Sequence, residues 1–274
     1  MKTELLESLY VKYGIRQLSF GAIHDKLGDV YEEYCCAILS NPDSLSELKR
    51  AANTSFDIDV VKAILDCNGL SDYSSIQNIK ATTTIPHRAS GGLSKTDLIA
   101  YVTMIDGSMR VLRISCKQST VPKVALAEFD VDTICEEVGI TDPRLKELLL
   151  KHQVDCSAKN FTPTEKEDLM RLMAPIARDF VRWVLTGSPD KNSADICVPT
   201  SIVKFKLLPP KNRNNINIDN GDFRLVSFHA CDMESYIDSI MYTPTGQIRK
   251  GGFGTGLSWT YATGSKGKKM QFKG

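Results

Sequence analysis

The chain has 274 residues, of which 42% are hydrophobic and 24% are charged, as is usual for a soluble globular protein. No apolar run approaches the roughly 18 residues that a membrane span needs. The first four residues include an acidic side chain and begin no apolar signal core, so secretion is not expected. These features predict a cytoplasmic protein that makes no contact with membranes.

Eight cysteines are spread along the chain without the spacing of a metal site. Cys35 and Cys36 are adjacent, the others occur singly, and no Cys-x-x-Cys pair is present to hold zinc. A chain of this length can build a core that needs no disulfides. We therefore expect reduced, mostly buried thiols.

Basic residues are concentrated at the C-terminal end, although the net charge of the chain is only +1. No acidic residue follows Asp238. Charge alone suits either a polyanion-binding surface or a solvated tail, but interleaved aromatic residues at 253, 259, 261 and 272 favour an ordered segment. The basic residues of this segment are Arg249, Lys250, Lys266, Lys268, Lys269 and Lys273.

Hydrophobic periodicity predicts helices and strands in a mixed order. Helices are expected at residues 5–10, 27–34, 57–65, 131–138, 143–152 and 163–185. Strands are expected near 97–105, 109–117, 202–207 and 223–228, and residues 82–86 are expected to be strand and loop. Asp106-Gly107 predicts a tight hairpin between the strands at 97–105 and 109–117. A Gly-rich, basic region follows the last strand. Without repeats or a long linker, residues 1–274 are expected to form one mixed α/β domain.

This hairpin carries the residues with the clearest chemistry. Asp97 begins its first strand, and Ser115 and Lys117 near the end of its second strand share one face because side chains alternate. Pairing brings Asp97 opposite them. A carboxylate can hold Mg²⁺, which polarises a phosphate and activates water, while an ammonium orients that water or stabilises the developing charge. The same residues also suit an edge hairpin with a solvated Asp and Lys.

The pattern resembles the PD-(D/E)xK nuclease superfamily, with Thr96-Asp97 in place of Pro-Asp and Ser115 at a usually acidic position. Longer runs are similar, in matching order, to a family of type II restriction endonucleases. These runs are Gly91–Asp97, Ala127–Val131, Lys151–Gln153, Ser157–Lys159, Gly252–Ala262 and Lys268–Gly274.

The resemblance implies an α/β nuclease with a mixed central β-sheet flanked by helices. The catalytic core is then expected within about residues 1–125, and further helices with a C-terminal DNA-recognition segment within about 126–274. It implies Mg²⁺-dependent cleavage of double-stranded DNA at the palindrome CCGG. It also implies a cognate DNA methyltransferase as functional partner. Two active sites for a palindrome could come from a homodimer, or one chain could nick each strand in turn.

The resemblance implies a catalytic role for four residues of this chain. Asp97 and Lys117 match the catalytic pair of the family, and Ser115 stands where the family has Asn. A hydroxyl is a shorter and weaker ligand, so the backbone carbonyl of Cys116 is expected to help Asp97 and Ser115 bind the metal. Glu32 matches a Glu that completes the site; the alternative for it is an exposed charge on a helix face.

DNA contacts are implied in the C-terminal segment. Thr260, Gln271 and Lys273 match residues expected to touch bases, and Thr263 replaces a Ser. A lysine that donates to guanine suits a G·C target. Lys266, Lys268 and Lys269 are expected to bind phosphates. Ala125 stands where the family has a Ser, which removes one base contact.

Other functions fit the sequence less well. The glycine run from Gly252 to Gly256 is followed by too few residues for the βαβ unit of a nucleotide-binding methyltransferase. The Gly92–Thr96 run lacks the glycine that precedes lysine in a P-loop. The four histidines have no metal or nucleophile spacing. A non-catalytic, sequence-specific DNA-binding protein with a degraded metal site stays open because of Ser115.

Overall fold

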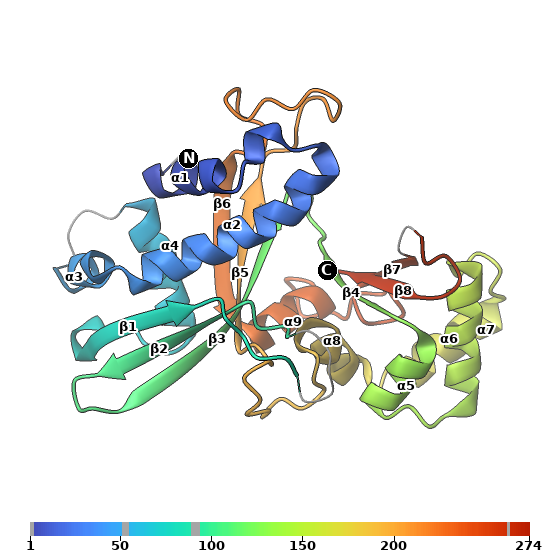
Figure 1. Cartoon of the computed structure of the whole chain (residues 1–274). Coiled ribbons are helices and arrows are strands. Elements are labelled where there is room, and N and C mark those ends of the chain that lie inside the picture. Colours follow the sequence, from blue (N-terminus) through green and yellow to red (C-terminus); the bar gives the residue numbers. More distant parts are fainter. Residues whose placement is uncertain (1–2, 51–54, 89–93, 262–263) are drawn as a thin grey trace. The chain divides into compact units, whose positions relative to one another are not determined.

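The computed structural model describes residues 3–50, 55–88, 94–261 and 264–274. The chain forms two compact units, which Figure 1 draws with the elements labelled. The first unit contains Met1–Pro122 and Ile196–Met233, and the second contains Lys123–Asp195 and Glu234–Gly274. The first unit is therefore built from two separate stretches of sequence.

Four α-helices open the first unit. They are α1 (Glu4–Lys12), α2 (Phe20–Ser40), α3 (Pro42–Arg50) and α4 (Phe56–Cys67), with short 3-10 turns at Ile15–Gln17 and Tyr73–Ser75. The hydroxyls of Thr3 and Ser55 accept hydrogen bonds from the backbone of Leu6 and Ile58, which caps α1 and α4. The sequence predicted α1, α2 and α4, but α3 was not expected.

A five-stranded mixed sheet forms the centre of the first unit. Its strands, in spatial order, are β1 (Ile76–Thr82), β2 (Leu98–Met104), β3 (Met109–Ser119), β5 (Ser201–Leu207) and β6 (Leu225–Asp232). The β3–β5 pair is parallel and the other pairs are antiparallel. The hairpin predicted around Asp106-Gly107 is therefore confirmed as β2–β3.

The two faces of this sheet differ in chemistry. The face that carries Ile114, Cys116 and Phe205 belongs to the main hydrophobic core. Helix α2 runs across this sheet and contacts β1, β2 and β3, while α4 contacts β5 and β6 (Figure 1). Because side chains alternate, the opposite face of β3 carries Ser115 and Lys117. The helices thus cover the apolar face, and the candidate residues emerge on the other.

Among its described residues, the second unit combines five helices with a three-stranded antiparallel sheet. The helices are α5 (Val131–Val138), α6 (Pro143–Asp155), α7 (Pro163–Met173), α8 (Ala177–Thr186) and α9 (Met233–Met241). The sheet has the order β4 (Ala125–Phe129), β8 (Met270–Lys273) and β7 (Ser258–Tyr261). Its buried aromatic core includes Phe180, Trp183, Trp259 and Phe272. The aromatic residues of the C-terminal segment thus order it, as the sequence predicted.

The strand expected within 82–86 is only the end of β1, which runs from Ile76 to Thr82. The extent of one predicted helix was wrong. The single helix expected over residues 163–185 is two helices, because α7 ends at Met173 and α8 begins at Ala177. Pro175 lies in the break, and proline has no N–H to donate and clashes with the preceding turn. The sequence did contain the signal for this interruption.

The cysteines form no disulfides, and no helix among the described residues could span a membrane. All eight cysteines are unpaired thiols, and four of them are buried: Cys35, Cys116, Cys135 and Cys197. Within the described part of the chain, no helix is long and apolar enough to cross a membrane.

Candidate active site

Asp97 is placed by the last rung of the β2–β3 ladder. Its N–H donates a 2.9 Å hydrogen bond to the carbonyl of Ile114, directly before β2 begins. Strand β3 continues past this point to Ser119 and pairs there with β5. The edge of β3 that faces away from β5 therefore has no strand partner beyond Asp97, and this edge is where the side chain lies.

One oxygen of the Asp97 carboxylate accepts three hydrogen bonds. Oδ2 accepts hydrogen bonds from the Lys117 ammonium at 2.7 Å, the Ser115 hydroxyl at 3.0 Å and the Cys116 N–H at 2.7 Å. The Lys117 and Asp97 side chains are 27% and 17% exposed, so the ion pair is only partly shielded from solvent. The hairpin has thus brought Asp97, Ser115, Cys116 and Lys117 together, as the sequence predicted.

The charged groups of this cluster shift one another's pKa values. Burial by itself lowers the pKa of Lys117, but the charge and hydrogen bond of Asp97 outweigh it and raise the pKa above its usual value. Lys95 is half-buried nearby. Its pKa falls to about 8, first because of burial and then because of repulsion from Lys117. Lys117 therefore stays a firmly held cation at neutral pH.

Glu32 reaches the same cluster from α2. The side chain is half-buried, and its pKa is raised to about 7, chiefly by burial and then by the negative charge of Asp97. Lys117 opposes this shift. No residue that the structure describes donates a hydrogen bond to the Glu32 carboxylate. Glu32 is therefore not a solvated charge on an outer helix face; its role in a metal site stays a prediction.

The donor atoms suit a hard cation. Cys116 donates its N–H toward Asp97, and a strand residue directs its N–H and carbonyl to the same side, so the Cys116 carbonyl faces this cluster too. Together with the carboxylates of Asp97 and Glu32, these are the oxygen ligands that Mg²⁺ prefers. Over the described residues, no group of three or more His, Cys, Asp or Glu side chains is arranged so that it could hold a metal ion by itself. A metal here would need the backbone oxygen, water and phosphate as further ligands.

The predicted base-contacting residues share one face of the small sheet. In the β7–β8 register, Thr260 pairs with Gln271, and Lys273 pairs with Ser258. The alternate positions, Trp259 and Phe272, are buried in the core of the second unit. The Gln271 amide donates a 2.5 Å hydrogen bond to Glu128 on β4. The sheet thus presents a polar row made of Thr260, Gln271 and Lys273.

The predicted phosphate contacts lie before β8. Lys266, Lys268 and Lys269 are exposed, and the Lys266 ammonium lies 6.0 Å from the Tyr261 ring centroid. Thr263 lies outside the described residues. Asp130 lies close enough to Lys269 for the charge of the lysine to lower the pKa of that carboxyl slightly, after its hydrogen bonds to Thr133. These positions suit a solvated basic rim beside the polar row.

Comparison with known proteins bears on this geometry. The model of a family described as restriction endonuclease MspI matches residues 10–274. The type II restriction enzyme MspI of a Moraxella species is 37% identical over 281 residues, with 100% of both chains covered. The chain belongs to the MspI restriction endonuclease family. A crystal structure of restriction endonuclease MspI with its cognate DNA also covers 100% of both chains, at 37% identity and a TM-score of 0.85. This match confirms the predicted fold class.

The glycine run between Gly252 and Gly256 has a structural role in the second unit. Gly256 has φ of +73°, and a Cβ there would lie 1.9 Å from the carbonyl oxygen of Ile240 on α9. Gly252 has φ of +58°, and its Cβ would lie 2.2 Å from the Leu257 carbonyl oxygen. These glycines permit tight turns and close backbone packing. They are not the phosphate loop of a nucleotide-binding protein.

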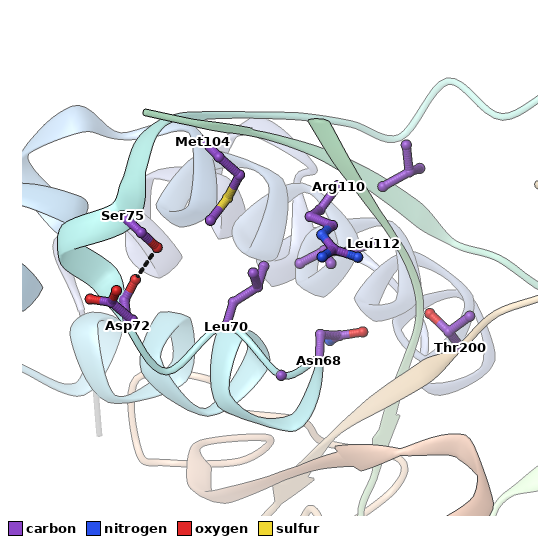
Figure 2. Close-up of a pocket in the computed structure, with 10 residues that line it drawn as sticks. Asn68, Leu70, Asp72, Ser75, Met104, Arg110, Leu112 and Thr200 are labelled. Atoms are coloured by element: carbon purple, nitrogen blue, oxygen red, sulfur yellow. Dashed lines mark hydrogen bonds between the residues drawn. The ribbon is translucent and has the colours of Figure 1, made fainter. Parts of the chain in front are cut away.

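A hollow in the first unit is separate from the Asp97 cluster. It has a volume of about 470 Å³ and lies between the end of α4 and the β2–β3 hairpin. Figure 2 shows Leu70 and Met104 among its lining residues, with Asp72 and Ser75 close together at one end. None of its lining residues belongs to the Asp97 cluster. An enzyme that acts on a duplex needs an open surface more than an enclosed pocket.

One residue of the cluster was missed by sequence analysis. Lys95 lies two positions before Asp97, and its charge interacts with both Asp97 and Lys117. The spacing is a usable signal, because alternate residues of an extended segment project to the same side. Lys95 lies within the Gly91–Asp97 run, but the sequence alone assigned it no role.

Proposed function

We propose that this protein is a Mg²⁺-dependent type II restriction endonuclease that hydrolyses double-stranded DNA at CCGG. The observation that carries the proposal is the convergence of three hydrogen-bond donors on one oxygen of Asp97. This arrangement fixes the carboxylate and the Lys117 ammonium, while the other Asp97 oxygen is not used by these donors. The resemblance of the whole chain to a type II restriction enzyme supports the same activity.

Each residue of the cluster has a role in this proposal. Asp97, Glu32 and the Cys116 carbonyl would hold Mg²⁺. The bound metal ion would polarise the scissile phosphate and lower the pKa of an attacking water. Lys117 has three N–H donors, so after its hydrogen bond to Asp97 it can still orient water or stabilise charge on the phosphate. Ser115 positions Asp97 through its hydrogen bond and would act as a weak additional ligand.

Recognition of the target is proposed for the second unit. Lys273 can donate to the O6 and N7 atoms of guanine, and Gln271, Thr260 and Thr263 offer further donors and acceptors to base edges. Lys266, Lys268 and Lys269 would neutralise phosphates and make the affinity salt-dependent. The relative solved with its cognate DNA supports a duplex as the substrate.

Further features follow from the proposed activity. A nuclease that cuts so short a site would also cut the DNA of its own cell, so a cognate methyltransferase and a cytoplasmic location are proposed with it. A palindrome has two identical scissile bonds, and a homodimer would supply one active site for each. The single chain offers one Asp97–Lys117 cluster, so the monomer would have to nick the strands in turn.

A second candidate function is sequence-specific DNA binding without cleavage. The observation that favours it is Ser115, which is 2% exposed and offers only a hydroxyl where an acidic or amide ligand is expected. A weaker ligand set lowers the affinity for metal. The two candidates differ only in whether the bound DNA is cut.

A cleavage assay separates these candidates. A linear duplex with a single CCGG is incubated with the protein in Mg²⁺, beside a duplex in which that site is scrambled. The proposal expects two fragments from the first duplex and none from the second, and EDTA should stop the reaction. Sequencing of the fragment ends then gives the cut position. Specific binding without cleavage in either Mg²⁺ or Mn²⁺ would rule out the enzyme and support the binding protein.

A further inference from the structure

A row of basic side chains crosses the sheet of the first unit beside the Asp97 cluster. The β3–β5 register pairs Lys117 with Lys204, and the β5–β6 register pairs Lys204 with His229. Paired residues in neighbouring strands project from the same face of a sheet. Lys206 projects from that face too, since it lies two residues after Lys204. The row therefore extends the cationic surface from the candidate active site toward the edge strand β6.

This face is hollowed where the row crosses β5 and β6. The hollow has a volume of about 300 Å³, and its lining includes Lys204, Lys206 and His229 together with Ser119, Thr120 and Ser227. None of its ten lining residues is Asp or Glu. Lys206, Ser227 and His229 are exposed. The hollow is therefore positively charged, carries hydroxyl donors and is open to a large ligand.

Lys204 lacks the counter-charge that a half-buried ammonium normally has. Its Nζ donates a 2.9 Å hydrogen bond to the carbonyl of Pro122, and it forms no ion pair with any carboxylate of the described residues. Burial lowers its pKa, and no neighbouring charge opposes that shift. A half-buried cation with only a neutral partner is a favourable site for an anion.

We propose that Lys204, Lys206 and His229 form a phosphate-binding track that holds the DNA backbone next to the scissile phosphate. Neighbouring strands are about 4.8 Å apart, so His229 lies about 10 Å from Lys117 across the sheet. One DNA strand carries a charge about every 3.4 Å along the helix axis. Because the backbone also winds around the axis, successive phosphates are farther apart in space than this, and the row is long enough to contact about two of them. Lys206 widens the track by about 6.6 Å along β5.

The track is a DNA-binding site within the first unit, distinct from the polar row of the second unit. Its ligands are phosphates, so it adds affinity and register but no sequence preference. The inference rests on the proposed function, because it takes duplex DNA as the ligand. It does not require that the DNA be cut.

The salt dependence of DNA binding tests the track. Equilibrium binding is measured in EDTA between 50 and 300 mM salt with two duplexes, one that contains CCGG and one random. For Lys206→Ala and for Lys204→Gln, the slope of log K against log salt should fall by about 0.9. Affinity at low salt should fall about fivefold, and equally for both duplexes. Lys49→Ala is the matched control, because Lys49 is an exposed lysine on α3 of the same unit.

The result that overturns the track is an unchanged salt slope in Lys206→Ala, a substitution at an exposed position that leaves the fold intact. A loss confined to the CCGG duplex also overturns it, since that pattern means base contact. Because EDTA prevents metal-dependent cleavage, a protein that never cuts DNA can still show the expected slopes. Failure of the proposed nuclease activity and failure of the track are therefore distinguishable.

Discussion

The hydroxyl of Ser115 donates a 3.0 Å hydrogen bond to the same oxygen of Asp97 that receives the Lys117 ammonium. Ser115→Ala removes this bond, which contributes about 1 kcal/mol. We expect the cleavage rate to fall about fivefold, since about 1.4 kcal/mol corresponds to a factor of ten. Ser115→Asn, which restores an amide ligand, should recover the loss. Single-turnover cleavage at several Mg²⁺ concentrations measures both variants.

Ser201→Ala is the control for Ser115. Ser201 is also a buried serine, 1% exposed. It pairs with Ile114, so it projects from the opposite face of the sheet to Ser115, and its hydroxyl accepts a hydrogen bond from Asn68. Its replacement should leave the rate per folded molecule unchanged. If the two alanine variants lose activity equally, the serine positions matter for stability and not for Asp97.

Lys273 should contribute to specificity more than to general affinity. The side chain lies on the polar face of β8 and has no hydrogen-bond or ion-pair partner among the described residues. Lys273→Ala should weaken binding to a CCGG duplex by about 10- to 100-fold, because a base contact contributes about 1–3 kcal/mol of discrimination. Binding to random duplex should change only severalfold. Equal losses on both duplexes would show that Lys273 contacts phosphate alone.

The ion pairs of Glu234 should stabilise the second unit. Its carboxylate accepts hydrogen bonds from Arg182 at 2.9 and 3.0 Å and from Arg178 at 2.7 Å, and the Arg182 side chain is only 6% exposed. These partners lower the pKa of Glu234 to about 2, with the Arg182 hydrogen bond as the main cause. Glu234→Gln leaves a buried guanidinium with Asp179 as its remaining anion. We expect a loss of about 3 kcal/mol in unfolding free energy at pH 7.

Urea denaturation measures the change in unfolding free energy caused by Glu234→Gln. Glu167→Gln on α7 is the control, because Glu167 is exposed and the same change there should stay within about 0.5 kcal/mol. If Glu234→Gln also changes the unfolding free energy by no more than about 0.5 kcal/mol, the ion pairs of Glu234 do not stabilise the second unit.

His152 should make stability depend on pH. It is 2% exposed, packs against the rings of Phe161, Phe253 and Trp259, and its Nδ1 has no partner among the described residues. Burial lowers its pKa to about 4, below the unfolded value of about 6.5. Between these values the unfolded chain binds more protons, so stability falls as pH drops from about 6.5 toward 4.

Unfolding free energies at pH 7 and pH 5 give the size of the His152 effect. About 1.5 pH units at about 1.36 kcal/mol each predict a loss of about 2 kcal/mol. His152→Phe keeps the aromatic packing and removes the titration, so its loss over the same interval should be smaller by that amount. Identical pH dependence in both proteins would contradict the depressed pKa of His152.

The Asp97 cluster could be predicted because its geometry is local. A short turn over residues 105–107, in which the Gly107 N–H donates to the Met104 carbonyl, fixes the register of the β2–β3 hairpin. The register places Asp97 against Ser115 and Lys117. Glu32 comes from a distant helix, so it could be found only through the resemblance to a nuclease family. The pattern of residues alone gave no reason to prefer it over other carboxylates of α2.

Elements that depend on distant pairing were harder to predict. Strand β4, in the middle of the chain, pairs with β8 at its C-terminal end, and both strands are short. Their hydrophobic alternation spans too few residues to stand out. The row of Lys117, Lys204 and His229 arises from strands that meet only in the fold, through the parallel β3–β5 pair. No spacing in the sequence relates these three residues.

The cleavage and binding of Lys117→Ala test the central claim most directly. Single-turnover cleavage of a CCGG duplex in Mg²⁺ and equilibrium binding of the same duplex in EDTA are compared for wild type, Lys117→Ala and the control Lys49→Ala. We predict that Lys117→Ala cuts at least about 100-fold more slowly while its specific binding stays within a few-fold, since Lys117 acts on the reacting phosphate. Retained cleavage, or a loss of binding that accounts for the whole loss of cleavage, would contradict a catalytic role for the Asp97–Lys117 pair.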